Sequence, residues 1–167
     1  MKITKNKITF FVNNHDGPGY KNFWILLEMG LWENSTFQIF NEFLDTEHSY
    51  IDIGAWIGPT VLYGCQLAKH CYAVEPDPVA LKILQENIDL NPKLANNITL
   101  YRGCIGDSSG ILRLGSNTHF GDSMTSLLFN KSNKSLDVQS LTFDDFIKRN
   151  NINDYSFIKM DIEGGGD

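Results

Sequence analysis

From residue 49 onward, short apolar stretches alternate along the chain with stretches of helical periodicity. The pattern predicts strands over residues 49–53, 70–74, 98–101 and 156–162, further extended segments over 111–114 and 137–141, and helices over 59–68, 78–91 and 142–150. Strands that alternate with helices form βαβ units, and such units build a parallel sheet covered by helices. The sequence therefore predicts an α/β fold.

The first 48 residues have a different pattern. Residues 1–12 predict one strand centred on ITFFV, and residues 21–30 and 34–45 predict two helices, the second capped by Asn34 or Ser35. A chain of 167 residues can bury one core but not two. We expect a single domain over 1–167, with 1–48 as an N-terminal strand and helical layer and 49–167 as the core.

The first predicted core strand ends in a glycine-containing loop, DIGAWIG, which runs from Asp52 to Gly58. Ligands of parallel sheets bind in the crevice beyond the carboxyl ends of the strands, where this loop would lie. The helix that starts at Pro59 would point free N–H groups toward the crevice, which favours a carboxylate or a phosphate. The loop lacks the G-x-G-x-x-G pattern of pyrophosphate sites, and a plain strand-to-helix turn remains an equal alternative.

Two further strand ends carry charged side chains. Glu75 follows the second strand, where a carboxylate suits a bidentate grip on two ribose hydroxyls; alone, it would also fit a solvent-facing turn. In FIKMDIEG, Lys159 and Asp161 lie within a predicted parallel strand, where a charge is costly unless it is paired or lies at the open end. For Lys159 a structural ion pair and a functional role remain equally open. For Asp161 its place at the crevice favours function.

Composition excludes several classes of function. The net charge is −6 and the pI about 5.1, so there is no basic surface for nucleic acid or an anionic membrane. The apolar run ITFFV is too short for a signal peptide or a membrane span. The three cysteines lack metal-ligand spacing and are expected to be reduced thiols. We expect a cytoplasmic protein without metal, membrane or nucleic-acid partner.

Taken in order, the motifs YIDIGAWIG, YAVEPDP, RGCIGD, GDSMTS and FIKMDIEGG resemble the FkbM-type methyltransferases. The resemblance covers roughly residues 32–166. It implies a Rossmann-like three-layer sandwich with a mostly parallel sheet, and S-adenosylmethionine as cofactor. It also implies O-methylation of a sugar or natural-product hydroxyl. The acceptor that carries this hydroxyl would be a small molecule or a glycan.

The resemblance also implies roles for individual residues. The loop around the methionine part of the cofactor would contain Asp52, Gly54, Ala55 and Gly58, the ribose would be bound by Glu75, and the adenine would be bordered by Cys104 and Ile105, with Asp107 as a further candidate. Asp161 would face the methyl group and the acceptor. The candidate catalytic bases are Asp161 and Glu163, with His119, Ser123 and Ser126 as further candidates whose ordinary interpretation is solvated loop residues.

The chain departs from the family pattern at its end. It stops at Asp167, just past the fourth core strand, and Gly166 stands where the family usually has a glutamate. We therefore expect a C-terminally incomplete fold, an exposed sheet edge at residues 156–162 that pairs two copies into a homodimer, and impaired catalysis by this chain alone. Two alternatives remain open: an NAD(P)-dependent Rossmann oxidoreductase, disfavoured by the absence of G-x-G-x-x-G, and a truncated, non-catalytic cofactor-binding remnant.

Overall fold

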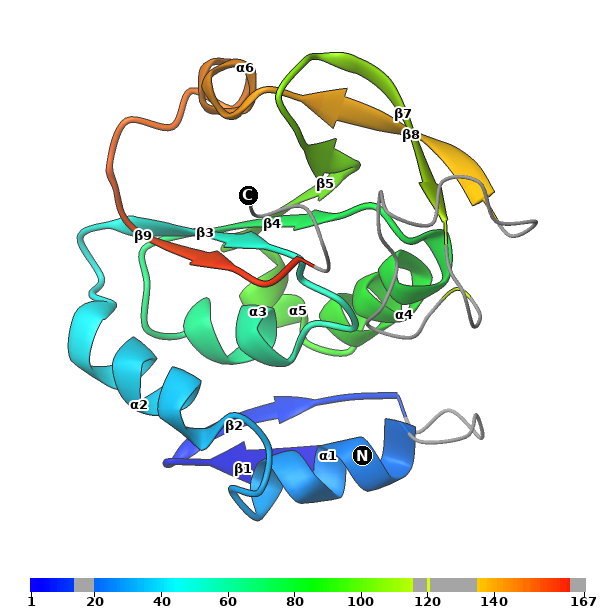
Figure 1. The fold of residues 1–167 in the computed structure, drawn as a ribbon. Coiled ribbons are helices and arrows are strands. Elements are labelled where there is room, and N and C mark those ends of the chain that lie inside the picture. Colours follow the sequence, from blue (N-terminus) through cyan, green and yellow to red (C-terminus); the bar gives the residue numbers. More distant parts are fainter. Residues whose placement is uncertain (14–19, 116–119, 121–134, 163–167) are drawn as a thin grey trace.

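A parallel sheet with the strand order β5–β4–β3–β9 forms the centre of the computed structural model, which describes residues 1–13, 20–115, 120 and 135–162 (Figure 1). The strands are β3 (Ser49–Ile53), β4 (Cys71–Glu75), β5 (Ile98–Arg102) and β9 (Tyr155–Met160). All three neighbouring pairs run parallel, so their carboxyl ends meet at one edge of the sheet. The predicted α/β fold with a mostly parallel sheet is confirmed.

Helices cover both faces of this sheet (Figure 1). One face carries α3 (Pro59–Gly64), α4 (Pro78–Asp89) and α5 (Pro92–Ala95), and the other carries α6 (Phe143–Arg149). Asp77 caps α4 by accepting hydrogen bonds from the Val79 and Ala80 N–H groups at 2.8 and 3.2 Å. Thr142 caps α6 through the Asp145 N–H at 3.1 Å. Both caps agree with the sequence pattern, because a short polar side chain before the first turn satisfies its free donors.

A second, smaller sheet follows the end of β5. It has the order β6–β8–β7, with β6 (Cys104–Ile105) parallel and β7 (Gly110–Gly115) antiparallel to β8 (Ser135–Leu141). The predicted extended segments correspond to β7 and β8, whereas β6 was not predicted. The Gly103 N–H donates to the Glu75 carbonyl at 3.2 Å and ties the start of β6 to the end of β4.

Two predictions for the N-terminal layer are wrong. Residues 1–12 form a hairpin of β1 (Lys2–Lys5) and β2 (Ile8–Phe11), rather than one strand, because Asn6 and Lys7 both adopt left-handed φ values of 47° and 71° and make a two-residue turn. The helix α1 (Tyr20–Glu28) agrees with prediction. The next helix, α2 (Asn34–Phe43), has no side-chain cap, because Glu33 takes the N-cap position and Asn34 is the first helical residue, with its Oδ1 accepting a hydrogen bond from the Lys5 Nζ.

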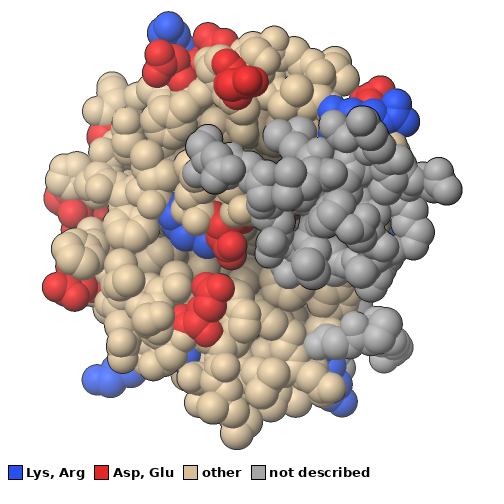
Figure 2. Space-filling view, in the orientation of Figure 1, with Lys and Arg blue, Asp and Glu red and all other residues tan. Residues whose placement is uncertain are grey.

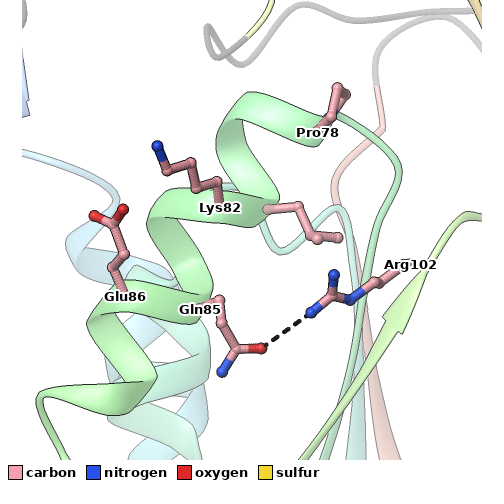
Figure 3. A pocket seen from close by; sticks show the side chains of 6 residues that line it. Pro78, Lys82, Gln85, Glu86 and Arg102 are labelled. Carbon is pink, nitrogen blue, oxygen red and sulfur yellow. Dashed lines mark hydrogen bonds between the residues drawn. The ribbon is translucent and has the colours of Figure 1, made fainter.

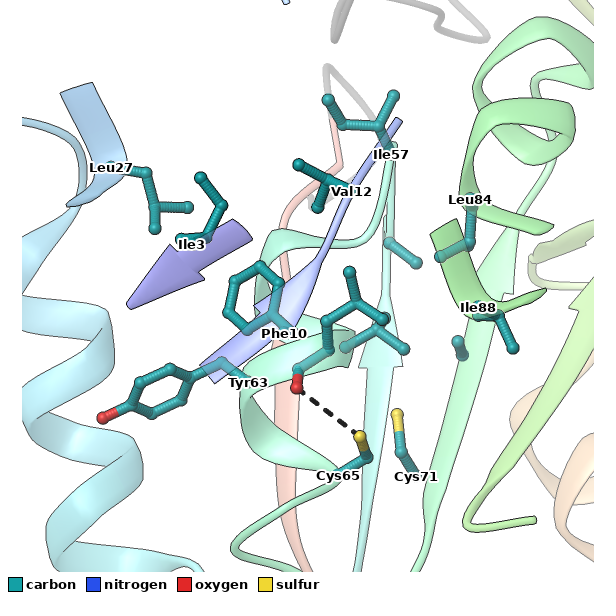
Figure 4. Close-up of a cluster of buried hydrophobic side chains, with 14 of the residues drawn as sticks. Ile3, Phe10, Val12, Leu27, Ile57, Tyr63, Cys65, Cys71, Leu84 and Ile88 are labelled. Atoms are coloured by element: carbon teal, nitrogen blue, oxygen red, sulfur yellow. Dashed lines mark hydrogen bonds between the residues drawn. The ribbon is translucent and has the colours of Figure 1, made fainter. Parts of the chain in front are cut away.

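One buried apolar cluster joins the N-terminal layer to the parallel sheet (Figure 4). Ile3 and Phe10 of the hairpin and Leu27 of α1 belong to the same cluster as Tyr63 of α3 and Leu84 of α4. The hairpin is also tied to the junction of α4 and α5, since the side chain of Asn91, which lies between these helices, accepts the Phe11 N–H at 2.8 Å and donates to the Phe11 carbonyl at 2.6 Å. In the part of the chain that the structure describes, no helix is long and apolar enough to cross a membrane.

Candidate functional site

The loop between β3 and α3, residues 54–58, crosses the carboxyl end of β4. Gly54 and Ala55 both donate their N–H groups to the Val74 carbonyl, at 3.0 and 3.1 Å. Gly54 has φ +82°, and a Cβ atom there would lie 1.9 Å from the Asp161 carbonyl oxygen. Only glycine therefore allows the chain beyond β9 to approach the loop so closely. The loop lies between the ends of β4 and β9, where the sequence predicts a ligand.

Gly58 closes the loop against α4. Its φ is +94°, and a Cβ atom there would lie 2.5 Å from the Leu84 Cδ1. The missing side chain at Gly58 thus allows the close approach of α4. Between the two glycines Trp56 also has a left-handed φ, of 48°, and its N–H donates to the Glu75 Oε2 at 2.7 Å. Sequence reasoning missed this contact, because nothing in the residue type tryptophan indicates a positive φ.

Glu75 is held in place by two backbone donors at the end of β4. Its Oε2 accepts from Trp56 and its Oε1 accepts the Asp77 N–H at 2.8 Å, and the residue is only 5% exposed. Burial raises the pKa of the Glu75 carboxyl to about 7, and the two backbone hydrogen bonds partly oppose the shift. The carboxylate is therefore fixed between the β3–α3 loop and the start of α4.

Asp52 lies beneath the same loop and is 0% exposed. Neither of its carboxylate oxygens makes a hydrogen bond to a group that the structure describes, although the Lys159 Nζ lies 3.2 Å from its Oδ1. The two residues are register partners on β3 and β9. Burial raises the pKa of Asp52, and the charge of Lys159 opposes this shift. A buried carboxylate without hydrogen bonds is costly unless a partner or ligand satisfies it.

Lys159 joins Asp52 to the crevice. Its Nζ donates to the Gly54 carbonyl at 2.8 Å and lies 3.7 Å from the Asp161 Oδ2. Burial acts to lower the pKa of Lys159, but the Asp52 and Asp161 carboxylates outweigh it, so the pKa is raised and the side chain is charged. The Asp161 N–H donates to the Ile53 carbonyl at 2.9 Å, while its side chain is exposed at the crevice. Figure 2 shows basic side-chain atoms, in blue, beside acidic side-chain atoms, in red, near the middle of the face of the molecule that it draws.

Cys104 and Ile105 lie one strand away from the loop, in β6. Both are half-buried, and the bond between Gly103 and Glu75 brings them to the ends of β4 and β5. Burial raises the pKa of the Cys104 thiol. The structure thus gathers Asp52, Gly54, Ala55, Glu75 and Asp161, with Cys104 and Ile105 beside them. The candidates Glu163, His119, Ser123 and Ser126 lie outside the described residues.

A pocket of about 420 Å³ opens near the ends of β5 and α4 (Figure 3). It is lined by Pro78, Leu81, Lys82, Gln85, Glu86 and Arg102. None of the predicted site residues lines it, so we do not assign the ligand site to this pocket. Among residues 1–13, 20–115, 120 and 135–162, no group of three or more His, Cys, Asp or Glu side chains is arranged to hold a metal ion.

The sequence matches the methyltransferase FkbM domain over residues 52–166, which is most of the chain. The chain belongs to the FkbM methyltransferase family. The match starts at Asp52 and covers every predicted site residue. The parallel sheet with helices on both faces is the Rossmann-like arrangement expected of this family, and the family match favours a methyltransferase over the oxidoreductase alternative. No match was found among curated proteins.

Several solved structures resemble this one. The methyltransferase FkbM of Methylobacillus flagellatus KT shares 19% identity at a TM-score of 0.49, over 86% of this chain and 37% of that one. Trm5 of Methanocaldococcus jannaschii, in complex with adenosine, shares 22% identity at a TM-score of 0.40, over 59% of this chain and 28% of that one. A tRNA m1G37 methyltransferase of M. jannaschii shares 18% identity at a TM-score of 0.42, over 68% and 43%. This chain spans only 26% to 43% of the length of such structures.

Proposed function

We propose that this chain binds S-adenosylmethionine across the carboxyl ends of β3 and β4, and that it belongs to an enzyme that methylates a hydroxyl group. The observation that carries the proposal is the carboxylate of Glu75, held by backbone donors from the β3–α3 loop and the start of α4. Each of its oxygens keeps acceptor capacity for one hydroxyl of a ribose. A carboxylate in this fixed position binds a diol without having to be ordered first.

The residues present fit this cofactor. Asp52 offers a buried carboxylate that lacks a hydrogen bond among the described groups, and Gly54 lets the Asp161 backbone lie close against the loop. The methionine part would lie along the loop of Asp52, Gly54, Ala55 and Gly58, and the adenine beside Cys104 and Ile105. A sulfonium is cationic, and an acidic crevice favours it. No pyrophosphate has to be bound, which agrees with the absence of G-x-G-x-x-G.

When bound, S-adenosylmethionine supplies an electrophilic methyl group. The protein then has to align the acceptor, exclude water and accept the proton of the hydroxyl. Asp161 is the described carboxylate that suits this last role, because it lies at the crevice beside the loop and is exposed toward an incoming acceptor. Glu163 is the second candidate base.

The charge of the chain supports a small-molecule or glycan acceptor, such as a sugar or natural-product hydroxyl, over nucleic acid. The net charge is −6, whereas a protein that binds a polyanion usually presents a basic surface. The free cysteines Cys65, Cys71 and Cys104 support a reducing, cytoplasmic setting.

Calorimetric titration with S-adenosylhomocysteine tests the cofactor site without requiring turnover. We expect the folded chain to bind it, and we expect Glu75→Gln to weaken binding at least tenfold, because a carboxylate oxygen is lost as an acceptor. Glu28→Gln is the matched control, since the Glu28 Oε1 also accepts a backbone N–H, from Thr4 at 2.8 Å, but in the N-terminal layer. NAD is the competing ligand and should not bind.

The outcomes separate the candidate functions. Equal binding by the wild type and Glu75→Gln would contradict the assignment of the ribose site. A folded wild type that binds NAD but not S-adenosylhomocysteine would refute the proposal. Binding without methyl transfer to any hydroxyl acceptor would favour the non-catalytic alternative for this chain.

A further inference from the structure

We infer that Lys159 is a positioning residue of the cofactor site, which fixes the β3–α3 loop through the Gly54 carbonyl and orients the Asp161 carboxylate at the crevice. The inference rests on the proposed function, because the loop that Lys159 contacts is the proposed cofactor loop. Lys159 itself need not touch the cofactor. The sequence left a structural ion pair and a functional role equally open for this lysine.

The ammonium group of Lys159 lies where three segments meet. Its Nζ contacts Gly54 O at 2.8 Å, Asp52 Oδ1 at 3.2 Å and Asp161 Oδ2 at 3.7 Å. These oxygens belong to the loop, to β3 and to the chain beyond β9. The ammonium donates a hydrogen bond to the Gly54 carbonyl and forms ion pairs with the two carboxylates. The side chain is only 12% exposed, which limits competition from water.

The order of these distances indicates more than charge neutralisation. A lysine that served only to neutralise Asp52 would make its shortest contact with that carboxylate. Instead the shortest contact, and the hydrogen bond, is with the neutral carbonyl of Gly54. This carbonyl belongs to the residue whose missing side chain makes room for the Asp161 backbone. Lys159 therefore holds the loop at the edge of the sheet where the carboxyl ends of β3, β4 and β9 lie side by side.

Other hydrogen bonds join the loop to β4 and α4, and the Trp56 ring packs on Phe23 of α1 with ring centroids 4.7 Å apart. Gly54 and Ala55 donate to Val74, Trp56 donates to Glu75, and the Asn87 Nδ2 donates to the Ile57 carbonyl at 2.9 Å. These bonds tie the loop to β4 and α4. Lys159 provides the anchor toward β9 and Asp161. Its loss should leave the loop without this anchor, with its first carbonyl free to turn and Asp161 free to move.

The test is the affinity of the folded chain for S-adenosylhomocysteine, compared between Lys159→Met, Lys159→Arg and Lys5→Met. Lys5 is a matched control, because its Nζ is also buried and donates to a backbone carbonyl, Leu27 O at 3.1 Å, but in the N-terminal layer. We expect at least tenfold weaker binding for Lys159→Met, about threefold weaker for Lys159→Arg, and no change for Lys5→Met. Arginine keeps the charge but cannot place one nitrogen among all three oxygens.

Amide hydrogen exchange supplies a second, local measurement. Exchange at residues 55–58 should become faster in Lys159→Met and stay unchanged in Lys5→Met, whereas a role in charge balance alone would leave the loop protected. If Lys159→Met does not fold, Lys159→Arg decides: a threefold or larger loss of affinity supports the inference, and wild-type affinity overturns it.

The two proposals fail in different ways. A wild type that does not bind S-adenosylhomocysteine would refute the proposed function, and loop exchange in the variants would then decide the positioning role by itself. A wild type that binds, together with a folded Lys159→Met that binds equally well, would overturn the positioning role and leave the proposed function intact.

Discussion

Lys5 and Lys159 are both buried lysines, one in the N-terminal layer and one at the crevice. Lys5 is 4% exposed and its Nζ donates to Leu27 O at 3.1 Å and to Asn34 Oδ1 at 3.0 Å. Lys159 likewise contacts one backbone carbonyl, but its other two contacts, at 3.2 and 3.7 Å, are with carboxylate oxygens of Asp52 and Asp161. Burial lowers the pKa of Lys5, whereas two carboxylates raise the pKa of Lys159 against the same effect of burial.

The two lysines therefore differ in their partners: the replacement of Lys5 leaves neutral groups behind, whereas the replacement of Lys159 leaves carboxylates behind. The acceptors of Lys5 are neutral, so the loss of its charge leaves no charged partner behind at these atoms. The removal of Lys159 leaves the fully buried Asp52 without its partner, and unpaired buried charge is among the most costly defects in a folded protein. The predictions below use variants from both regions to test this contrast.

The largest expected effect is on stability. Lys159→Met should lower the free energy of unfolding by about 3–5 kcal/mol, because the buried Asp52 loses its partner. Lys5→Met should cost about 1–2 kcal/mol, because two neutral acceptors lose a donor while the apolar stem is replaced by one of similar size. Urea denaturation of both variants gives the comparison. Equal losses would show that the carboxylates do not distinguish the two regions.

The second prediction compares two glycines with left-handed φ values. Gly54→Ala should cost about 2–5 kcal/mol, because a strained φ is combined with a Cβ atom placed 1.9 Å from the Asp161 carbonyl oxygen. Gly30→Ala in the N-terminal layer has φ +74°, but its Cβ atom would meet nothing closer than the Asn34 Oδ1 at 3.4 Å, so about 1–2 kcal/mol is expected. Thermal unfolding measures both. A tolerated Gly54→Ala would mean that the chain beyond β9 can move away from the loop.

The sequence predicted the strands and helices of the central sheet better than the N-terminal layer, for a physical reason. The strand at residues 49–53 and the caps Asp77 and Thr142 follow from local signals, namely a short apolar run and polar residues before proline or an amphipathic stretch. The hairpin was missed because its turn, Asn6-Lys7, contains no glycine. Such a turn is selected by the packing of the strands on α3 and α4 rather than by its own residues.

The role of Lys159 could not be predicted from the sequence, for a different reason. Its pairing with Asp52 depends on the register of β3 against β9, strands that are about a hundred residues apart along the chain. The capping role predicted for Asn34 was also wrong, because Glu33 takes the N-cap position, and the Asn34 side-chain oxygen accepts from Lys5, a residue distant in sequence. Local patterns thus predicted the elements, and non-local contacts decided which polar groups are paired.

The third prediction concerns pH. Burial raises the pKa of Glu75 from 4.5 to about 7, so the folded state binds a proton more tightly than the unfolded state does. Its contribution to stability is therefore fully present below pH 4.5 and is lost as the pH rises through 7. The shift corresponds to a loss of at most about 3 kcal/mol. Glu75→Gln lacks the titrating carboxyl group and should gain stability relative to the wild type as the pH rises from 4.5 to above 7.

Urea denaturation at several pH values checks this dependence, with Glu28→Gln as the control from the N-terminal layer. The difference in unfolding free energy between the wild type and Glu75→Gln should change with pH, and Glu28→Gln, at an exposed position, is measured under the same conditions for comparison. A constant difference for Glu75→Gln would show that its carboxyl titrates alike in the folded and unfolded states.

The smallest effect on stability is expected at the sheet edges, where the two regions also differ. In the N-terminal hairpin, Asn91 satisfies both backbone groups of Phe11 on β2. In the central sheet, β9 is the last strand among the described residues, and Ile158 on it is 40% exposed. An exposed edge strand with apolar side chains is a template for pairing with another strand. We therefore predict that two copies associate through β9.

Sedimentation over a range of concentrations tests this association, with Ile158→Lys and Phe11→Lys as a matched pair of edge substitutions. Ile158→Lys should shift the wild-type dimer to the monomer, because an antiparallel pairing of two β9 strands brings like charges close together. Phe11→Lys should leave association unchanged, since Asn91 already satisfies that backbone edge. Both substitutions are at exposed positions and should change monomer stability by no more than about 0.5 kcal/mol. A wild type that stays monomeric at all concentrations would show that the exposed edge of β9 does not pair two copies.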